Sequence, residues 1–251
     1  MHPVIFVTGA TSGFGAATAR LFASKGWKVV ATGRRRDRLE ALQSEFDVDT
    51  IHIARLDLTD PKSIEAVVEG LPAGFTPIRC LFNNGGLALG TLPVPDAKPE
   101  DWRVMAETNM MGLVHMTMAA IPLLKRAGRG ALIINVGSVA GSYAYRGGNF
   151  YGASKAFVRQ FTMNLRTDLA DTDIRVTDLA PGMAKSEFTK VRTYGDDAAN
   201  EKFYEGVEPI LPGDIAETVW WLANLPAHLN VNVLEMMATC QTPAGFNIRR
   251  D

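Results

Sequence analysis

The stretch TGATSGFG, residues 8–15, decides the fold, because it follows directly on the apolar run that begins at Val4. Its glycines allow a tight turn, close approach of the backbone to a pyrophosphate, and close packing of a helix on a sheet. A helix beginning at Gly13 would present its free N–H groups and its positive dipole end to such phosphates. Any tight strand-to-helix turn favours glycine, but the position of this turn after the first strand favours a dinucleotide site.

Outward from this turn, short β-branched runs alternate with longer segments of helical period, a pattern typical of a parallel sheet covered on both faces. Strands are predicted at Val4–Thr8, Lys28–Thr32, Thr50–Leu56, Arg79–Phe82, Ala131–Val136, Ile174–Leu179 and Asn232–Met236. Helices are predicted at Gly13–Ser24, Arg36–Glu45, Pro61–Leu71, Pro99–Leu124, Asn149–Leu169 and Pro212–Leu225. We therefore expect an α/β fold: one domain over residues 1–251, with a single Rossmann-type, doubly wound parallel sheet of about seven strands.

The least regular segment is residues 183–207, which contains Gly195 and several charged residues. A long irregular segment in a compact domain is often a functional lid, so we expect a substrate lid here. A solvated surface excursion is the alternative.

The composition excludes several classes of protein. The 251 residues are 47% hydrophobic and 21% charged, which suits a sizeable core, and the formal net charge of -1 gives no reason to expect nucleic acid or an anionic membrane as partner. No apolar stretch approaches the ~20 residues of a membrane span, and the start of the chain does not resemble a secretory signal. Cys80 and Cys240 are too few for a disulfide framework or a zinc cage. A cytoplasmic protein without a metal is the default expectation.

The end of the second predicted strand reads TGRRR, residues 32–36. An NAD site of this type usually has an acidic residue about 20 positions after the glycines, to hold the ribose 2′-hydroxyl. Arg34 and Arg35 stand there instead, and guanidinium groups suit a 2′-phosphate. An ordinary basic helix start is the alternative, but positive charge there opposes the helix dipole. The sequence therefore favours NADP over NAD.

Tyr151 and Lys155 are four residues apart, hence on one face of a predicted helix. A nearby ammonium, with the positive nicotinamide ring, stabilises a phenolate and lowers the tyrosine pKa. The tyrosine can then accept a proton from an alcohol or donate one to a carbonyl oxygen. Ser138, just past the fifth strand, could hydrogen-bond the same substrate oxygen, because open α/β sheets bind ligands at carboxyl strand ends.

Together these motifs resemble the short-chain dehydrogenase/reductase family, over nearly the whole chain. The matching positions are Thr8, Gly9, Ala10, Thr11, Ser12, Gly13, Phe14, Gly15, Asp57, Asn83, Asn84, Gly85, Gly86, Asn109, Ser138, Tyr151, Lys155, Pro181 and Gly182. The resemblance implies that Asp57 and Leu58 flank the adenine and that residues 84–86 line the cofactor. It implies that Asn109 and Lys155 hold a proton-relay water, that Lys155 also binds the nicotinamide ribose, and that the carboxamide lies near Pro181, Gly182 and Ser186.

One position departs from the family pattern, which is usually Asn-Asn-Ala-Gly on the fourth strand. Gly85 replaces the alanine. We expect the lost methyl to loosen this turn and to alter cofactor affinity modestly, without touching the chemistry.

Residues 84–90, 151–161, 164–169 and 225–230 resemble one branch of the family more closely. That branch includes the bacterial NADP-dependent 3-hydroxy acid dehydrogenases, acting on serine, allo-threonine and malonic semialdehyde, and the sulfoacetaldehyde reductases. The resemblance implies a small substrate with an alcohol or aldehyde at one end and an anion at the other. It also implies a homotetramer, in which the tail Gln241–Asp251 could reach a neighbouring subunit.

An anionic substrate needs a cation or an N–H donor. Arg192, in the predicted lid, is the first candidate, with Arg146 and Lys185 as weaker ones and Gln241 as a neutral donor. Two other functions stay open at this point. A reductase of neutral ketones or aldehydes would not need Arg192, and a catalytically silent nucleotide sensor would be expected to lack the tyrosine or the lysine.

Overall fold

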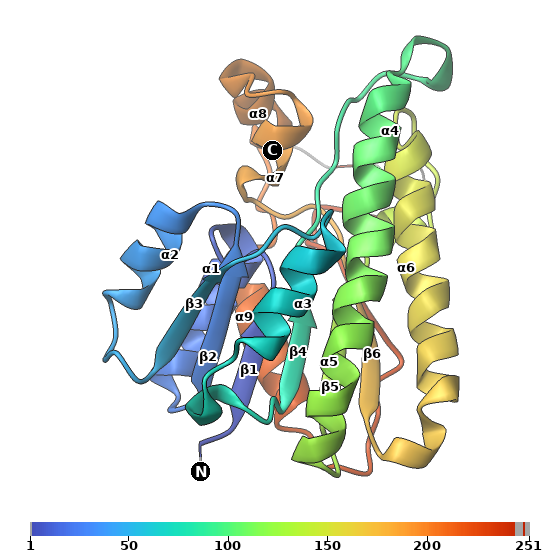
Figure 1. Cartoon of the computed structure of the whole chain (residues 1–251). Helices are drawn as coiled ribbons and strands as arrows, with labels where there is room; N and C mark the ends of the chain where they lie inside the picture. Colours follow the sequence, from blue (N-terminus) through green and yellow to red (C-terminus); the bar gives the residue numbers. More distant parts are fainter. Residues whose placement is uncertain (1, 244–247, 249–251) are drawn as a thin grey trace.

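The structure, a computed structural model, describes residues 2–243 and residue 248. Its centre is one parallel sheet with the strand order β3-β2-β1-β4-β5-β6-β7 (Figure 1). The crossover lies between β1 and β4, as in doubly wound sheets. The prediction of an α/β sheet of about seven strands is therefore confirmed. The strands are β1 Val4–Val7, β2 Lys28–Gly33, β3 Ile51–Arg55, β4 Cys80–Asn83, β5 Leu132–Val136, β6 Arg175–Pro181 and β7 Val233–Met236.

Helices cover both faces of this sheet. The α-helices are α1 Gly13–Ser24, α2 Arg36–Gln43, α3 Pro61–Glu69, α4 Pro99–Met105, α5 Leu113–Ala127, α6 Asn149–Asp168, α7 Glu187–Arg192, α8 Asp197–Tyr204 and α9 Pro212–Ala223. A π-helical segment, Ala106–Gly112, joins α4 to α5, and single 3₁₀ turns lie at Ala73–Phe75, Val94–Asp96, Val139–Gly141 and Ala170–Thr172. Among the described residues, no helix is long and apolar enough to cross a membrane.

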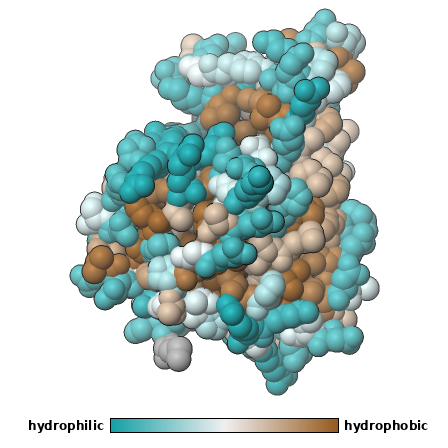
Figure 2. Space-filling model, in the orientation of Figure 1, coloured by the Kyte–Doolittle hydropathy of each residue, from teal (hydrophilic) through white to brown (hydrophobic). Residues whose placement is uncertain are grey.

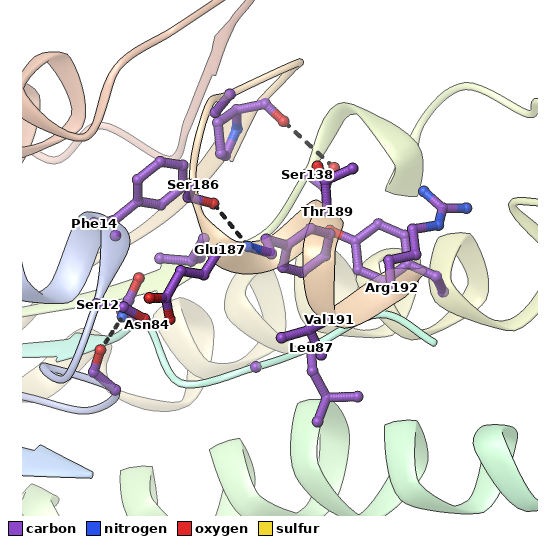
Figure 3. Close-up of a pocket in the computed structure, with 18 of the residues that line it drawn as sticks. Ser12, Phe14, Asn84, Leu87, Ser138, Ser186, Glu187, Thr189, Val191 and Arg192 are labelled. Atoms are coloured by element: carbon purple, nitrogen blue, oxygen red, sulfur yellow. Dashed lines mark hydrogen bonds between the residues drawn. The ribbon is translucent and has the colours of Figure 1, made fainter. Parts of the chain in front are cut away.

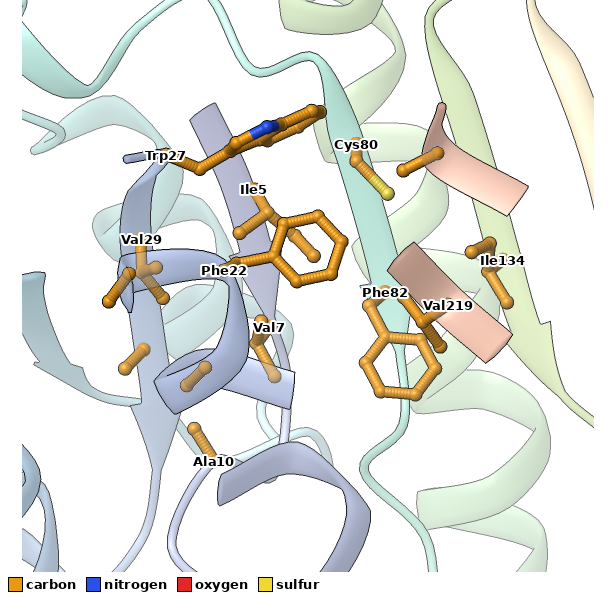
Figure 4. Packing of buried hydrophobic residues seen from close by; sticks show 14 of the residues in the cluster. Ile5, Val7, Ala10, Phe22, Trp27, Val29, Cys80, Phe82, Ile134 and Val219 are labelled. Carbon is orange, nitrogen blue, oxygen red and sulfur yellow. The ribbon is translucent and has the colours of Figure 1, made fainter. Parts of the chain in front are cut away.

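Alternate side chains of each inner strand enter two separate cores. Ile5 and Val7 of β1 pack with α1, α2 and α9, whereas Phe6 packs with α3, α5 and α6 on the other face. On the first face Phe22 and Trp27 meet edge to face, with ring centroids 5.0 Å apart (Figure 4). Burial on both faces explains why these strands are apolar without alternation. The result is a close-packed platform that fixes the positions of the strand ends.

Two predicted elements differ from the structure. The helix expected at Pro99–Leu124 is interrupted by the π-helical segment. Residues 183–207 are not irregular, because they contain α7 and α8. The side chains of Ser186 and Asp196 accept hydrogen bonds from the first turns of these helices, and such short capped helices carry too few residues to show a period. In the space-filling view the top of the molecule, where α8 lies in Figure 1, is largely hydrophilic, and a hydrophobic patch lies directly beneath it (Figure 2).

Candidate active site

A cleft of about 870 Å³ lies at the carboxyl ends of the strands. Its walls are the turn after β1, the ends of β2, β4, β5 and β6, the start of α6, and helix α7 (Figure 3). This is the place where open α/β sheets bind ligands. Most of the sequence-predicted site residues line it: Gly9, Thr11, Ser12, Gly13, Phe14, Arg34, Arg35, Asp57, Leu58, Asn84, Gly85, Gly86, Ser138, Arg146, Tyr151, Lys155, Pro181, Gly182, Ser186, Arg192 and Gln241.

The glycine turn has the backbone geometry that its sequence predicts. Gly9 and Gly13 have φ values of 69° and 52°, in the left-handed region that side chains disfavour. Gly15 lies behind the turn and does not line the cleft, and a Cβ there would be 2.4 Å from the Gly9 carbonyl oxygen. The Asn84 side chain donates to the Thr8 carbonyl at 2.9 Å, which ties the turn to β4. At Gly9 and Gly13 the backbone of the turn is therefore exposed to the cleft without a side chain, and Asn84 holds the turn in place from behind.

The space left by the missing methyl at Gly85 is filled. A Cβ at this position would lie 2.6 Å from Cδ1 of Leu58. The Gly85 amide also donates to Oγ1 of Thr8 at 2.8 Å. The expectation of a loosened turn is therefore wrong, because a neighbouring side chain occupies the volume.

The two predicted arginines differ in their contacts. The guanidinium of Arg35 donates to Oγ1 of Thr11 at 2.9 Å and to Oγ of Ser12 at 2.8 Å, so cation and hydroxyls gather at one end of the cleft. Arg34 is exposed, and its charge acts on the carboxyl of Asp57. Hydrogen bonds from the Thr59 backbone, and more weakly this charge, lower the Asp57 pKa.

The predicted catalytic side chains meet at the other end. Ser138 follows β5 and caps a 3₁₀ turn by accepting from the Ala140 amide at 3.1 Å. Lys155, only 7% exposed, donates to the Val136 carbonyl at 2.7 Å. Its ammonium lies 5.9 Å from the centroid of the Tyr151 ring, as the four-residue spacing on α6 requires.

Burial dominates the proton affinities of this cluster. It raises the pKa of Tyr151, while a hydrogen bond with Ser138 and the charge of Arg192 oppose the rise. The expected lowering of the tyrosine pKa is therefore not produced by the protein's own groups, because removal of the phenol from water outweighs them. Burial also lowers the pKa of Lys155 to about 8.

Asn109 lies in the π-helical segment and stands behind the cleft wall rather than on it. Its side chain accepts from the Leu87 amide at 2.9 Å and donates to the Leu87 carbonyl at 2.7 Å. A Cβ on Gly86 would lie 3.1 Å from Oδ1 of Asn109 and 3.8 Å from Nζ of Lys155, so this glycine separates the two polar groups. Asn109 and Lys155 therefore both lie close to Gly86, and Asn109 reaches this position from the π-helical segment.

The candidate substrate-binding residues differ in their position and in their hydrogen bonds. Arg192 at the end of α7 donates to the Gly90 carbonyl at 3.2 Å and to the Gly147 carbonyl at 3.1 Å, through Nε and Nη2. Its guanidinium carbon lies 5.7 Å from the centroid of the Tyr151 ring, and among the described residues no carboxylate forms a salt bridge with it. Lys185 does not line the cleft. Gln241 lines it, but its Oε1 accepts from the Met183 amide at 2.7 Å, which makes the residue part of the wall.

Three charged residues near the cleft were not predicted. Glu187 forms ion pairs with both Arg35 and Arg38. Asp178 of β6 is a buried carboxylate beside Gly137. Arg38 could have been found, since it lies one helical turn after Arg34 and Arg35. Glu187 and Asp178 reach the site through contacts distant in sequence, which residue spacing does not encode. Among the described residues, no cluster of His, Cys, Asp or Glu could hold a metal ion.

A family model described as short chain dehydrogenase matches residues 3–196. The chain belongs to this family. It is 49% identical over 252 residues to a protein named sulfoacetaldehyde reductase 2 from Chromohalobacter salexigens, with all of both chains covered. It is 50% identical over 248 residues to the NADP-dependent 3-hydroxy acid dehydrogenase YdfG of Escherichia coli K12, covering 98% of this chain and 99% of that one.

Among solved structures, the closed form of a serine dehydrogenase complexed with NADP+ superposes with a TM-score of 0.94. The two sequences are 49% identical, and the match covers 99% of this chain and all of the other. As a short chain dehydrogenase, the protein described here is an oxidoreductase, which confirms the family and the reaction class expected from its motifs.

Proposed function

We propose that the enzyme transfers a hydride between NADP(H) and a small anionic hydroxy acid or aldehyde. The observation that carries this proposal is the position of Arg192, whose guanidinium lies 5.7 Å from the ring centroid of Tyr151 without a carboxylate partner among the described residues. A cation so near the proton-transfer residue attracts the anionic end of a short substrate. It also limits the distance between that anion and the reacting carbon.

The residues at the first end of the cleft fit NADP. The bare backbone of Gly9 and Gly13 admits a pyrophosphate, and Arg35 with Ser12 offers donors to a 2′-phosphate. When bound, the cofactor supplies or accepts the hydride. The names of the relatives point the same way, since one is called NADP-dependent and the serine dehydrogenase holds NADP+.

At the second end, Tyr151 is the proposed acid–base group. In the direction of reduction its hydroxyl donates a proton to the substrate oxygen, and in oxidation it takes that proton back. Ser138 donates a hydrogen bond to the same oxygen and so holds it within reach of the phenol. Lys155 stabilises the phenolate that remains, and Asn109, which like Lys155 lies close to Gly86, can help return the proton through water.

We propose residues 183–207 as the lid over this site, within a single domain of residues 1–251. Both ends of α7 line the cleft, and Figure 3 shows Glu187 at one of them and Arg192 at the other. Glu187 forms an ion pair with Arg35, and the guanidinium carbon of Arg192 lies 5.7 Å from the centroid of the Tyr151 ring. A movement of this helix would therefore change both halves of the site together. The proposed substrate class covers both a carboxylate and a sulfonate, because the relatives named above are called a sulfoacetaldehyde reductase and a 3-hydroxy acid dehydrogenase.

The test follows the absorbance of the reduced nicotinamide in purified enzyme, with NADPH and NADH supplied separately. Sulfoacetaldehyde, malonic semialdehyde and a neutral aldehyde of similar size are reduced in parallel. Isethionate, serine and 3-hydroxypropionate are oxidised with NADP+. We expect NADPH-dependent turnover of one anionic aldehyde well above the neutral one. Equal use of NADH, or preference for the neutral aldehyde, would contradict the proposal.

A further inference from the structure

Glu187, the first residue of α7, forms two ion pairs at the end of the cleft where Arg35 and Ser12 lie, the cofactor end. Its Oε2 lies 2.8 Å from Nη1 of Arg35, and its Oε1 lies 2.5 Å from Nη1 of Arg38. The arginines come from the start of α2, and both are about 150 positions distant from Glu187 in sequence. The carboxylate thus joins the lid helix to the nucleotide-binding half of the molecule.

Of the two arginines, Arg35 was expected to bind the 2′-phosphate, and it also donates to the hydroxyls of Thr11 and Ser12. Arg35 uses Nε and Nη2 for Thr11 and Ser12 and uses Nη1 for Glu187. Burial opposes ionisation of Glu187, but the hydrogen bonds from Arg38 and Arg35 lower its pKa overall, so it is a carboxylate at neutral pH. The Glu187 carboxylate and a 2′-phosphate bound beside Ser12 would therefore share the guanidinium group of Arg35, through different nitrogen atoms.

We propose that Glu187 competes with the 2′-phosphate of the cofactor for the charge of Arg35, and thereby limits the affinity for NADP(H). This inference rests on the proposed use of NADP(H). Two anions held by one guanidinium group repel each other, so each weakens the other's binding. Because such coupling is reciprocal, a bound 2′-phosphate loosens the contact that ties α7 to α2. Glu187 is thus a specificity-determining residue that also links the lid to the identity of the cofactor.

An ordinary surface ion pair would have no such effect, and the chain offers a matched example. Arg20 and Glu45 pair at 2.6 Å, and the side chain of Glu45 is 40% exposed against 41% for Glu187. Neither Arg20 nor Glu45 lines the cleft. Exposed pairs of this kind contribute little to stability, so removing either carboxylate should leave the fold intact.

The experiment measures, by calorimetry on the full-length enzyme, the dissociation constants of 2′,5′-ADP and of 5′-AMP, which lacks the 2′-phosphate. Glu187→Gln should tighten 2′,5′-ADP about five- to twentyfold, because it removes one like charge, and should change 5′-AMP less than about twofold. Glu45→Gln should alter neither ligand. The melting temperature of each variant checks the fold.

The outcomes separate this inference from the proposed function. If the wild-type enzyme binds 2′,5′-ADP no tighter than 5′-AMP, the NADP proposal fails and this inference fails with it. If the wild-type enzyme discriminates but Glu187→Gln leaves the ratio unchanged, only the competition is overturned. Weaker binding of 2′,5′-ADP by Glu187→Gln would also overturn it, since Glu187 would then support the arginines instead of competing for them.

Discussion

The charged side chains are buried at one end of the cleft and exposed at the other. The reaction end contains Tyr151 and Lys155, and the cofactor end contains Arg35 and Ser12. At the reaction end Lys155 is 7% exposed, and burial shifts both its pKa and that of Tyr151. At the cofactor end the side chains of Arg35 and Arg38 are 42% and 43% exposed and lie in ion pairs with Glu187. Charges in a buried site act on bond making, whereas exposed charges act on binding and are screened by salt. Substitutions at the reaction end should therefore change turnover, and those at the cofactor end should change affinity.

The largest effect is expected at Tyr151. Tyr151→Phe removes the proton-transfer hydroxyl, so kcat should fall by about 10²- to 10⁴-fold. The affinity for NADPH, followed by its fluorescence, should change little. Tyr143→Phe is the control, because this tyrosine bonds Glu235 and does not line the cleft. A mutant that keeps more than about a tenth of the wild-type kcat would break the distinction between the two ends.

The next effect concerns affinity. Arg35→Ala should raise the KM for NADPH about tenfold and leave the KM for NADH nearly unchanged, because the proposed partner of this guanidinium is a phosphate that NADH lacks. The NADPH effect should shrink as salt is added. Arg36→Ala is the matched control, since Arg36 pairs with Glu40 and does not line the cleft. An equal loss for both cofactors would show that Arg35 only shapes the turn.

A third test examines the buried carboxylate beneath the reaction end. Asp178 is 1% exposed, neither of its oxygens has a hydrogen-bond partner among the described residues, and burial raises its pKa to about 6. Folding therefore penalises the charged form, and the penalty is absent below the unfolded pKa of 3.8 and complete above about 6.

Asp178→Asn removes that penalty. The difference in unfolding free energy, mutant minus wild type, should grow in favour of the mutant by about 3 kcal/mol as the pH rises through this window. Denaturant titrations at pH values on either side of the window measure it. A difference that does not depend on pH would mean that the carboxyl is not titrating there.

The smallest effect is expected on the stability of the protein, at Gly85 in the wall of the cleft. Gly85→Ala places a methyl 2.6 Å from Cδ1 of Leu58, so it should destabilise the protein by about 1 kcal/mol. Combined with Leu58→Ala the methyl has room, and the double mutant should be more stable than the sum of the single changes predicts. Gly213→Ala, in α9 with no atom within 4 Å of the added Cβ, should not destabilise. Thermal melts of the four variants give the comparison.

Features that lie within single elements could be predicted from the sequence, whereas contacts between distant segments could not. Tyr151, Lys155 and the glycine turn lie on single elements, so their relative positions follow from helical and turn geometry. The order of elements fixes the sheet, and with it the place of Ser138 at a strand end. The contact of Glu187 with Arg35, the filling of Gly85 by Leu58 and the burial of Asp178 depend on packing between distant segments. The cytoplasmic location and the homotetramer stay predictions, and most of the tail expected to reach another subunit lies outside the described residues.

The central claim is that Arg192 selects an anionic substrate, and one measurement tests it directly. The kcat/KM values for sulfoacetaldehyde, malonic semialdehyde and a neutral aldehyde of the same length are compared in wild type and Arg192→Met, with Lys185→Met, outside the cleft, as control. We predict a loss of about 10²-fold for the anionic aldehyde that the wild type prefers, and less than about fivefold for the neutral one, because only the anion loses a charged partner. Equal losses for both classes of aldehyde would contradict the account.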